Sequence, residues 1–546
     1  MKRRISKLII VVICSVSTLI VSAQKNSSVT TITASDLESH VSFLASPLLM
    51  GRMNGETSLE IAAEYLAAQA KFLGLKPANG NSYFQTYTLN KEINDPDKTE
   101  VKIISEDEKD ITINKRPLFC VIPYGPSNIS LDGEVVFAGY GIRSSAHNYN
   151  DFANIETEGK ILLIMDRAPT TSDGVNCLFN NNEWLSENNI RMKFSALMQT
   201  RAKAILIVPD PKSGYNSLAE SDPQMAGYYG ARIFEGERRE RNIYSSSTPN
   251  VIFIHRNLAD NILKDTGFTL EALQNTIDQN LESFSFAVNK KITVNIETKV
   301  ETVTLKNVAG YIEGSDPVLK NEVVVYSSHY DHVGGYGDKI NVGADDNASG
   351  CAALLEMAQA FQLLKKKPRR TILFLWVSGE EIGLFGSAAY VKNPLFPLQN
   401  TVVNLNMDMI GRVKGVADTT DQYPMSGQNS VFLITDNQSS DLQAIADKVE
   451  KRNNLNFDYS LSGPNHPLRL FSRSDHYNFV RQDIPVLFFS TGLHTDYHTP
   501  RDVIELLDFN KMEAITRAMY EIGFEVANRK TRVVVDNPFS RWGNNR

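Results

Sequence analysis

The chain has 546 residues, more than one compact core usually accommodates, so two folded domains are expected. Hydrophobic residues make up 42% and charged residues 22%, which is ordinary for a soluble globular protein. The net charge of −7 argues against nucleic acid as a partner.

Residues 1–23 are typical of a secretory signal peptide. A basic start precedes the apolar run LIIVVICSVSTLIV, and small residues at 21–23 allow cleavage before Gln24. Removing this segment takes away four positive charges and leaves a net charge of about −11. We expect export to the periplasm or the extracellular space, with no stable membrane insertion after cleavage. An uncleaved membrane anchor is the alternative.

Residues 24–117 are expected to be the N-terminal part of the catalytic domain. The stretch 36–76 is mainly helical by its pattern, because alanine and leucine recur every three or four residues in LEIAAEYLAAQAKFLGL. Gly74 and Pro77 predict the end of that helix. Short strands with polar turns are expected over 84–115.

Residues 118–268 have a different texture, which indicates an inserted β-rich domain. Short β-like runs such as GEVVFAGYGI, GKILLIMD and AKAILIVPD alternate with polar, glycine-rich loops. A sheet continuous with the rest is the alternative. The main part of the catalytic domain follows over 269–530, and the tail 531–546 has no assigned role.

From residue 292 the pattern becomes regular. VNIETKVETVTLKNVAGYIEG suggests a β-hairpin, and strands then alternate with helices up to about residue 528. This alternation predicts an α/β fold with a mixed, mostly parallel sheet and helices on both faces. Ligands of such sheets bind beyond the carboxyl ends of the strands.

Acidic residues and histidines follow these strands, so they are expected at one edge of the sheet. Crowded carboxylates repel one another, and divalent cations relieve the repulsion. Imidazole and carboxylate ligands suit zinc. Two zinc ions would be balanced by three ligand carboxylates and a bridging hydroxide, with one histidine per ion. The residues concerned are His329, Asp331, Asp345, Asp346, Glu380, Glu381, Asp408 and His498.

Local spacing suggests how these residues divide their roles. His329 and Asp331 face one side of an extended strand, so Asp331 can accept a proton from the imidazole and fix its tautomer. His332 is expected to face away. Glu380 and Glu381 follow Gly379 at a turn, where one can bind metal and the other can act as a general base.

Four segments together resemble the zinc-dependent M28 peptidase family, which includes many aminopeptidases: HYDHVGGYGDKINVGADDNASG, SGEEIGLFGS, NLNMDMIG and DYHTPRDV. The resemblance implies a zinc-peptidase/phosphorylase-like fold and a cis peptide between Asp345 and Asp346. It also implies that Asp345 bridges the metals, Glu380 is the catalytic base and Tyr497 steadies the tetrahedral intermediate. The implied metal ligands are His329, Asp345, Glu381, Asp408 and His498.

The resemblance extends beyond these motifs. FLASPLLMGRMNGETSLEIAAEYLAAQAKFLGLKP is similar to the N-terminal helical part of secreted family members. GEVVFAGYGI and GKILLIMD resemble a protease-associated (PA) domain. Ser474-Asp475-His476 recurs near the site in the family and is given a supporting role, with a helix cap from Ser474 as the alternative.

These observations predict an exported zinc-dependent exopeptidase, an aminopeptidase acting on peptide substrates. Two Zn²⁺ per chain would hold a metal-bridged water that Glu380 deprotonates, although manganese or cobalt suits similar ligands. Three alternatives stay open. They are a carboxypeptidase, a glutaminyl cyclase with a single zinc, and a non-catalytic receptor-like binding protein.

No catalytic or metal-binding function is expected for the other histidines or for the cysteines. His40, His147 and His255 lie outside the motifs, His466 lies in a Gly-Pro loop with substrate contact as its alternative, and no ligand role remains for His494. The three cysteines after residue 23 lack a CxxC pattern, so a thiolate metal site is not expected and one disulfide is the most they can form. They are Cys120, Cys177 and Cys351.

Overall fold

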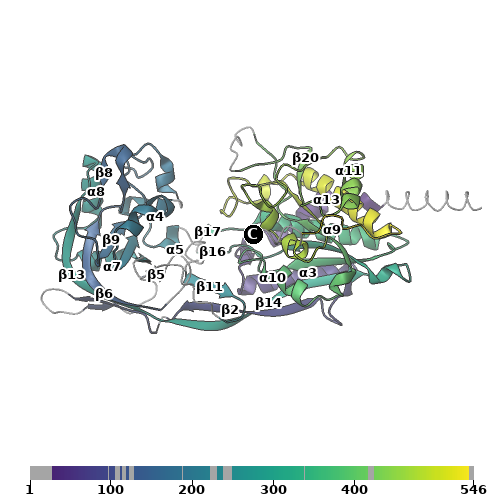
Figure 1. Cartoon of the computed structure of the whole chain (residues 1–546), viewed down its shortest axis with the longest axis horizontal. Helices are drawn as coiled ribbons and strands as arrows, with labels where there is room; N and C mark the ends of the chain where they lie inside the picture. The colour runs from purple at the N-terminus through teal and green to yellow at the C-terminus, as the bar shows by residue number, and fades with distance from the viewer. Residues whose placement is uncertain are drawn as a thin grey trace, which may run out of the picture. The chain divides into compact units, whose positions relative to one another are not determined.

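The computed structural model of the chain forms two compact units (Figure 1). Unit 1 comprises Met1–Tyr87 and Thr304–Arg546, and unit 2 comprises Thr88–Val303. The expected insertion, 118–268, falls within unit 2, which extends further at both ends. The structure describes residues 28–95, 97–104, 111–113, 119–121, 128–186, 189–221, 230–237, 249–336, 339–415 and 423–539. The expected signal peptide and the last seven residues of the tail lie outside these ranges.

Unit 1 is built on a mixed sheet whose central strands are parallel. The neighbours β18, β15, β19 and β22 all run in one direction, whereas β14 and β20 flank them antiparallel. This confirms the mixed, mostly parallel sheet predicted from the sequence. In order, the strands are β2 (Phe84–Asn94), β14 (Thr298–Ile312), β18 (Thr371–Val377), β15 (Val323–His329), β19 (Thr401–Met407), β22 (Val486–Ser490), β20 (Ser430–Ile434) and β21 (Asn456–Asp458), with β1 (Lys76–Pro77) also on β14.

Helices cover both faces of this sheet, as expected. On one face, α9 (Gly350–Gln362) and α13 (Phe509–Asn528) pack against strand residues such as Tyr326, whose ring contacts Phe361. On the other face, α10 (Phe385–Lys392) and α12 (His476–Val480) share a buried core with alternate strand residues. The helix α11 (Ser440–Glu450) packs on α13, and Figure 1 shows it with α9 and α13 in unit 1.

The N-terminal segment of unit 1 is helical, as the sequence predicts. It contains α2 (Ala34–Leu44) and α3 (Thr57–Phe72), joined by a short 3₁₀ turn. Thr33 caps α2 by accepting a hydrogen bond from the backbone N–H of Asp36. Gly74 follows α3 with a φ of +76°, the left-handed conformation in which glycine ends helices.

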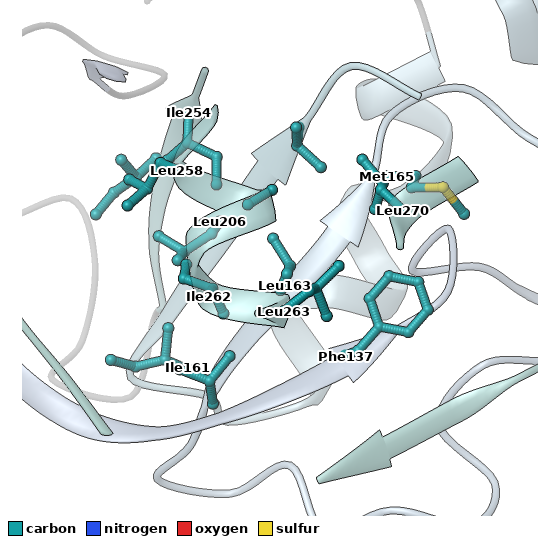
Figure 2. Close-up of a cluster of buried hydrophobic side chains, with 14 of the residues drawn as sticks. Phe137, Ile161, Leu163, Met165, Leu206, Ile254, Leu258, Ile262, Leu263 and Leu270 are labelled. Atoms are coloured by element: carbon teal, nitrogen blue, oxygen red, sulfur yellow. The ribbon is translucent and has the colours of Figure 1, made fainter. Parts of the chain in front are cut away.

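Unit 2 has its own sheet between two helical layers. The strands β6, β9, β10 and β12 are parallel. At their two edges β13 pairs antiparallel with β6 and β5 pairs antiparallel with β12, and β3 and β4 extend the sheet beyond β13, each antiparallel to its neighbour. Helices α7 and α8 pack on one face, where Leu163 and Leu206 meet Ile262 (Figure 2), and α4 packs on the other. The strands are β4 (Ile111–Ile113), β3 (Glu100–Ile104), β13 (Ser285–Ile296), β6 (Ile129–Ala138), β9 (Ile161–Met165), β10 (Ala204–Val208), β12 (Asn250–Ile254) and β5 (Phe119–Val121). The helices are α4 (Asn189–Gln199), α7 (Arg256–Leu263) and α8 (Leu270–Asn280).

Short elements complete the described ranges. Strand β11 pairs with the part of β2 that belongs to unit 2, and two small ribbons lie in loops. These elements are α5 (Leu218–Ser221), β11 (Ala231–Phe234), β7 (Arg143–Ser144) with β8 (Tyr149–Asn150), and β16 (Gly335–Tyr336) with β17 (Lys339–Ile340). Within the ranges described, no helix is long and apolar enough to cross a membrane.

The expected hairpin after residue 292 is wrong. Strands β13 and β14 are consecutive, but β13 pairs with β3 and β6, whereas β14 pairs with β18 and β1. Each strand therefore finds its partners far away in the sequence, and the chain leaves one sheet for another near Glu297. Local alternation identified both strands but could not show which strands they pair with.

Core packing in unit 2 can be tested at Leu163, which is fully buried in β9. We expect Leu163→Ala to lower the free energy of local unfolding by about 2–5 kcal/mol, because a cavity replaces the side chain. Hydrogen exchange of the amides of β9 and β10 measures this. Leu281→Ala, at a residue that is 40% exposed, is the control and should change protection little. Equal loss in both variants would contradict the packing described.

Candidate functional site

The carboxyl ends of the four parallel strands in unit 1 meet at one edge, and the acidic residues and histidines gather there. His329 ends β15, Glu380 and Glu381 follow β18, Asp408 follows β19, and His498 lies on the segment after β22. Parallel strands deliver the residues that follow them to the same edge, which is where ligands bind in such sheets. The sequence predicted this edge correctly.

Asp346 lies at the centre of this cluster. One of its carboxylate oxygens, Oδ1, is 3.3 Å from His329 Nε2, which is also 3.3 Å from Asp408 Oδ1. The other, Oδ2, is 3.1 Å from His498 Nε2, which is also 3.0 Å from Glu381 Oε2. A single carboxylate thus connects two sets of donor atoms, one on each of its oxygens.

Asp345, the residue expected at this central position, lies elsewhere. Its Oδ1 accepts a hydrogen bond from the N–H of Gly411 at 2.6 Å, and its Oδ2 is 3.4 Å from His494 Nε2. The cis peptide also differs from the expectation, because it joins Asp346 and Asn347. The central carboxylate and the cis peptide therefore both lie one residue later than expected. The backbone angles of the turn Ala344–Ser349 are irregular, so strand or helix periodicity cannot tell which of two neighbouring side chains faces the cluster.

Asp331 has a different role from the one expected. His329 Nδ1 lies 3.1 Å from the main-chain carbonyl oxygen of Asp331, but 3.8 Å from its carboxylate. The carbonyl therefore fixes the imidazole tautomer, because it can only accept a hydrogen bond and so requires an N–H at Nδ1. The carboxylate instead accepts hydrogen bonds from the backbone N–H groups of Glu380 and Glu381, both at 3.2 Å. It also accepts one from Asn54 Nδ2 at 2.6 Å.

A second buried carboxylate, that of Asp502, accepts hydrogen bonds from the backbone of the loop that carries Asp346. Asp502 accepts hydrogen bonds from the backbone N–H groups of Asp345 at 3.1 Å and Asp346 at 3.0 Å. Its place in the motif DYHTPRDV gave no indication of this function. The two carboxylates, Asp331 and Asp502, therefore hold the backbone of two separate loops that carry donor residues.

His332 belongs to the cluster, contrary to the expectation that it faces away. Its Nδ1 lies 2.8 Å from Glu381 Oε1 and 3.5 Å from Asp346 Oδ2. The strand β15 ends at His329, so strand alternation does not reach His332. Its position is fixed through the backbone, because its N–H donates to the carbonyl of Arg52 at 3.1 Å.

Arg52 is a buried cation that sequence reasoning missed. Its guanidinium donates to the main-chain carbonyls of Tyr330 at 2.8 Å, Val342 at 2.8 Å and Gly343 at 3.0 Å, and also to Leu44. These hydrogen bonds tie the loop after β15 to the loop before Asp346. The signal lay in GRMNGE, where a charged residue and an asparagine interrupt two helical segments.

The electrostatics of the cluster follow from burial and crowding. Burial raises the pKa of Glu380 well above its ordinary value, which favours the protonated form of its carboxyl group. Burial opposes the charging of His498, but the neighbouring Glu381 and Asp346 outweigh it and raise the pKa of His498 to about 10. Burial likewise opposes the charging of His329, but Asp408 and Glu380 outweigh it and raise the pKa of His329 well above its ordinary value.

Tyr497 lies beside the cluster, as expected. Its ring stacks on that of His498 with the centroids 3.7 Å apart, and its hydroxyl is 3.4 Å from an Nη of Arg473. Burial raises the pKa of Tyr497 well above its ordinary value, so the hydroxyl keeps its proton and can donate it in a hydrogen bond.

Ser474, Asp475 and His476 lie outside the donor sets of the cluster. Ser474 accepts a hydrogen bond from Asn406 at 2.8 Å and does not cap α12, so the helix-cap alternative is wrong. Burial raises the pKa of Asp475 to about 7 and lowers that of His476 to about 3. The neutral His476 ring stacks on Phe488 at 4.6 Å.

The remaining histidines and cysteines have other surroundings. His40 contacts Tyr65 and Glu356, His147 contacts Ser144, and His255 caps α7. His466 accepts a hydrogen bond from the N–H of Leu468. Cys177 and Cys351 are buried free thiols, and the side chain of Cys120 lies outside the described residues.

The donor atoms are suited to zinc. The set His329, Asp346 and Asp408 and the set His332, Asp346, Glu381 and His498 each place their donor atoms within 4.8 Å of one another. Imidazole and carboxylate are the zinc ligands expected for a catalytic site. The tautomer set by the Asp331 carbonyl leaves His329 Nε2 free to coordinate.

Comparison with known proteins agrees with this geometry. Residues 307–523 match the family model "Peptidase family M28". The chain is 30% identical over 237 residues to leucine aminopeptidase 1 of Trichophyton equinum, covering 41% of this chain and 60% of that protein. It is 29% identical over 256 residues to leucine aminopeptidase 1 of Paracoccidioides brasiliensis, covering 45% and 63%. The chain thus spans about 60% of the length of these curated relatives.

A solved structure shares the fold over most of its length. BSAP, a zinc aminopeptidase from Bacillus subtilis, superposes with a TM-score of 0.50 at 19% identity, covering 93% of this chain and 98% of that one. This superposition shows a shared fold. Residues 307–523 are similar in sequence to peptidase family M28.

The contact between His332 and Glu381 predicts an effect on metal binding. We expect His332→Ala to weaken zinc binding about 10- to 100-fold, because Glu381 loses the hydrogen bond that orients it. Competition with a chromophoric chelator measures the affinity. His332→Asn places an amide N–H near the position of Nδ1 and should retain most of it. Unchanged affinity in His332→Ala would show that the contact has no such function.

Proposed function

We propose that the protein is an exported zinc-dependent exopeptidase, an aminopeptidase with two zinc ions per chain. The observation that carries this proposal is Asp346, whose two oxygens face separate histidine-containing donor sets with Glu380 alongside. The names of the relatives, leucine aminopeptidases and a zinc aminopeptidase, support the substrate class.

The ligand assignment follows the two donor sets. His329, Asp346 and Asp408 would hold one zinc ion, and Asp346, Glu381 and His498 would hold the other. Asp346 therefore takes the bridging place that the sequence gave to Asp345. His332 supports Glu381 through the oxygen that faces away from His498. When bound, zinc polarises the scissile carbonyl and lowers the pKa of water.

Glu380 would transfer the proton, and Tyr497 would stabilise the negative charge of the oxyanion. Glu380 accepts the proton of the attacking water and later donates it to the departing amine, which its raised pKa permits. The Tyr497 hydroxyl donates a hydrogen bond to the oxyanion of the tetrahedral intermediate. The Asp331 carboxylate positions Glu380 and Glu381 by accepting hydrogen bonds from both of their backbone N–H groups.

Glu380→Gln tests the general base. Turnover of leucine p-nitroanilide should fall about 10²- to 10⁴-fold, because the amide cannot accept the proton of water. Bound zinc and thermal stability should stay close to those of the wild type. Glu505→Gln, at an exposed glutamate, is the matched control and should leave turnover unchanged. A rate for Glu380→Gln above about a tenth of that of the wild type would exclude this function.

Metal removal tests the cofactor. Dialysis against a strong chelator should abolish hydrolysis, and zinc should restore it, with about two ions per chain by elemental analysis. A content near one ion per chain would favour a glutaminyl cyclase, which works with one zinc. Absence of hydrolysis of any peptide by the metal-loaded protein would favour the receptor-like alternative.

A further inference from the structure

A small pocket adjoins the proposed catalytic residues in unit 1. Its lining includes the apolar residues Met409, Leu470, Phe488 and Leu493 and the polar residues Asp346, Glu380, Asp408 and Tyr497. Among the charged residues that line this pocket, Arg473 alone has no role in the proposed mechanism.

Arg473 is an exposed cation held at the reacting centre. Its Nη is 3.4 Å from the Tyr497 hydroxyl, and its guanidinium carbon lies 6.0 Å from the centroid of the tyrosine ring. No carboxylate of the described ranges lies within ion-pair distance of it. The other arginines facing this region are paired, because Arg412 and Arg501 both bind Asp496 at 2.7 Å.

An unpaired guanidinium beside the oxyanion donor is well placed to receive an anion. Guanidinium groups bind carboxylates through two parallel hydrogen bonds, with strict geometry and little flexibility. The catalytic carboxylates facing the same pocket would be neutralised by zinc, so a further carboxylate could enter without net repulsion.

We propose that Arg473 is a specificity-determining residue that binds a carboxylate of the substrate. This inference rests on the proposed peptidase function and narrows its substrate class. Since Arg473 lies within hydrogen-bond distance of Tyr497, the carboxylate lies within a few bonds of the scissile carbonyl. Two groups satisfy this condition: the free C-terminus of a dipeptide and the acidic side chain of an N-terminal glutamate.

Paired substrates distinguish the two sources. Leucyl-glycine is compared with leucyl-glycinamide for the C-terminal carboxylate, and glutamyl p-nitroanilide with glutaminyl p-nitroanilide for the side chain. We expect the wild type to favour the acidic member of one pair by about tenfold or more in kcat/KM. Arg473→Gln should abolish that preference mainly through KM, while Arg473→Lys should retain part of it.

One control variant and two contrary results complete this test of Arg473. Arg481→Gln removes an exposed arginine that does not line the pocket and should leave both ratios unchanged. Ratios near one in both pairs would overturn the proposal. An equal loss of kcat in Arg473→Gln on all substrates would also overturn it, because it would show that Arg473 only positions Tyr497.

Failure of the peptidase function itself would be recognised separately. The wild type would then hydrolyse none of the four compounds, nor leucine p-nitroanilide. Calorimetry of leucyl-glycine and leucyl-glycinamide with the zinc-loaded wild type and Arg473→Gln still tests carboxylate binding in that case. Binding that favours the acid and depends on Arg473 supports the inference, and binding without preference contradicts it.

Discussion

The arrangement of unit 1 depends on one electrostatic constraint, which is the burial of many carboxylates at a single sheet edge. A buried carboxylate is costly unless it receives hydrogen bonds or opposite charge. Asp331 and Asp502 accept hydrogen bonds from backbone N–H groups. Asp346, Glu381 and Asp408 face histidines. Each of these five carboxylates therefore has a specific partner, and the backbone partners of Asp331 and Asp502 fix the positions of the loops.

Two kinds of carboxylate share this edge, and they differ in what surrounds them. The carboxylates of Asp331 and Asp502 accept hydrogen bonds from main-chain N–H groups. These hydrogen bonds fix the loops that bear Glu380, Glu381 and Asp346. The second kind faces imidazole nitrogens and remains able to bind cations. Gly379 contributes to this shape, because its φ of +71° turns the chain at the end of β18 and a Cβ there would lie 2.8 Å from the Tyr87 hydroxyl.

The edge of the sheet was predictable from the sequence, but the choice between neighbouring residues was not. Alternating strands and helices indicate a parallel sheet, and residues that follow its strands must meet, which correctly brought together His329, Glu381 and His498. Within the turn Ala344–Ser349 the backbone is irregular, so periodicity could not decide between Asp345 and Asp346. His332 was misjudged for the related reason that its strand ends three residues earlier.

Contacts between distant segments were also beyond the sequence. Arg52 and Asn54 carry no motif chemistry of their own, and their importance appears only when the loops they hold are seen. In the same way, β13 and β14 were recognised as strands, but their partners lie far away in the chain, so a hairpin was expected wrongly. Arg473 was likewise invisible until the pocket brought it beside Tyr497.

The attachment of Arg52 and Asn54 has a consequence for biosynthesis. Their partners lie 277 to 291 positions later in the chain, beyond the whole of unit 2. A nascent polypeptide emerging from the ribosome contains the early half of this clamp long before the late half has been translated. The clamp, and with it the arrangement of the donor cluster, can therefore form only after residues up to Gly343 have been translated.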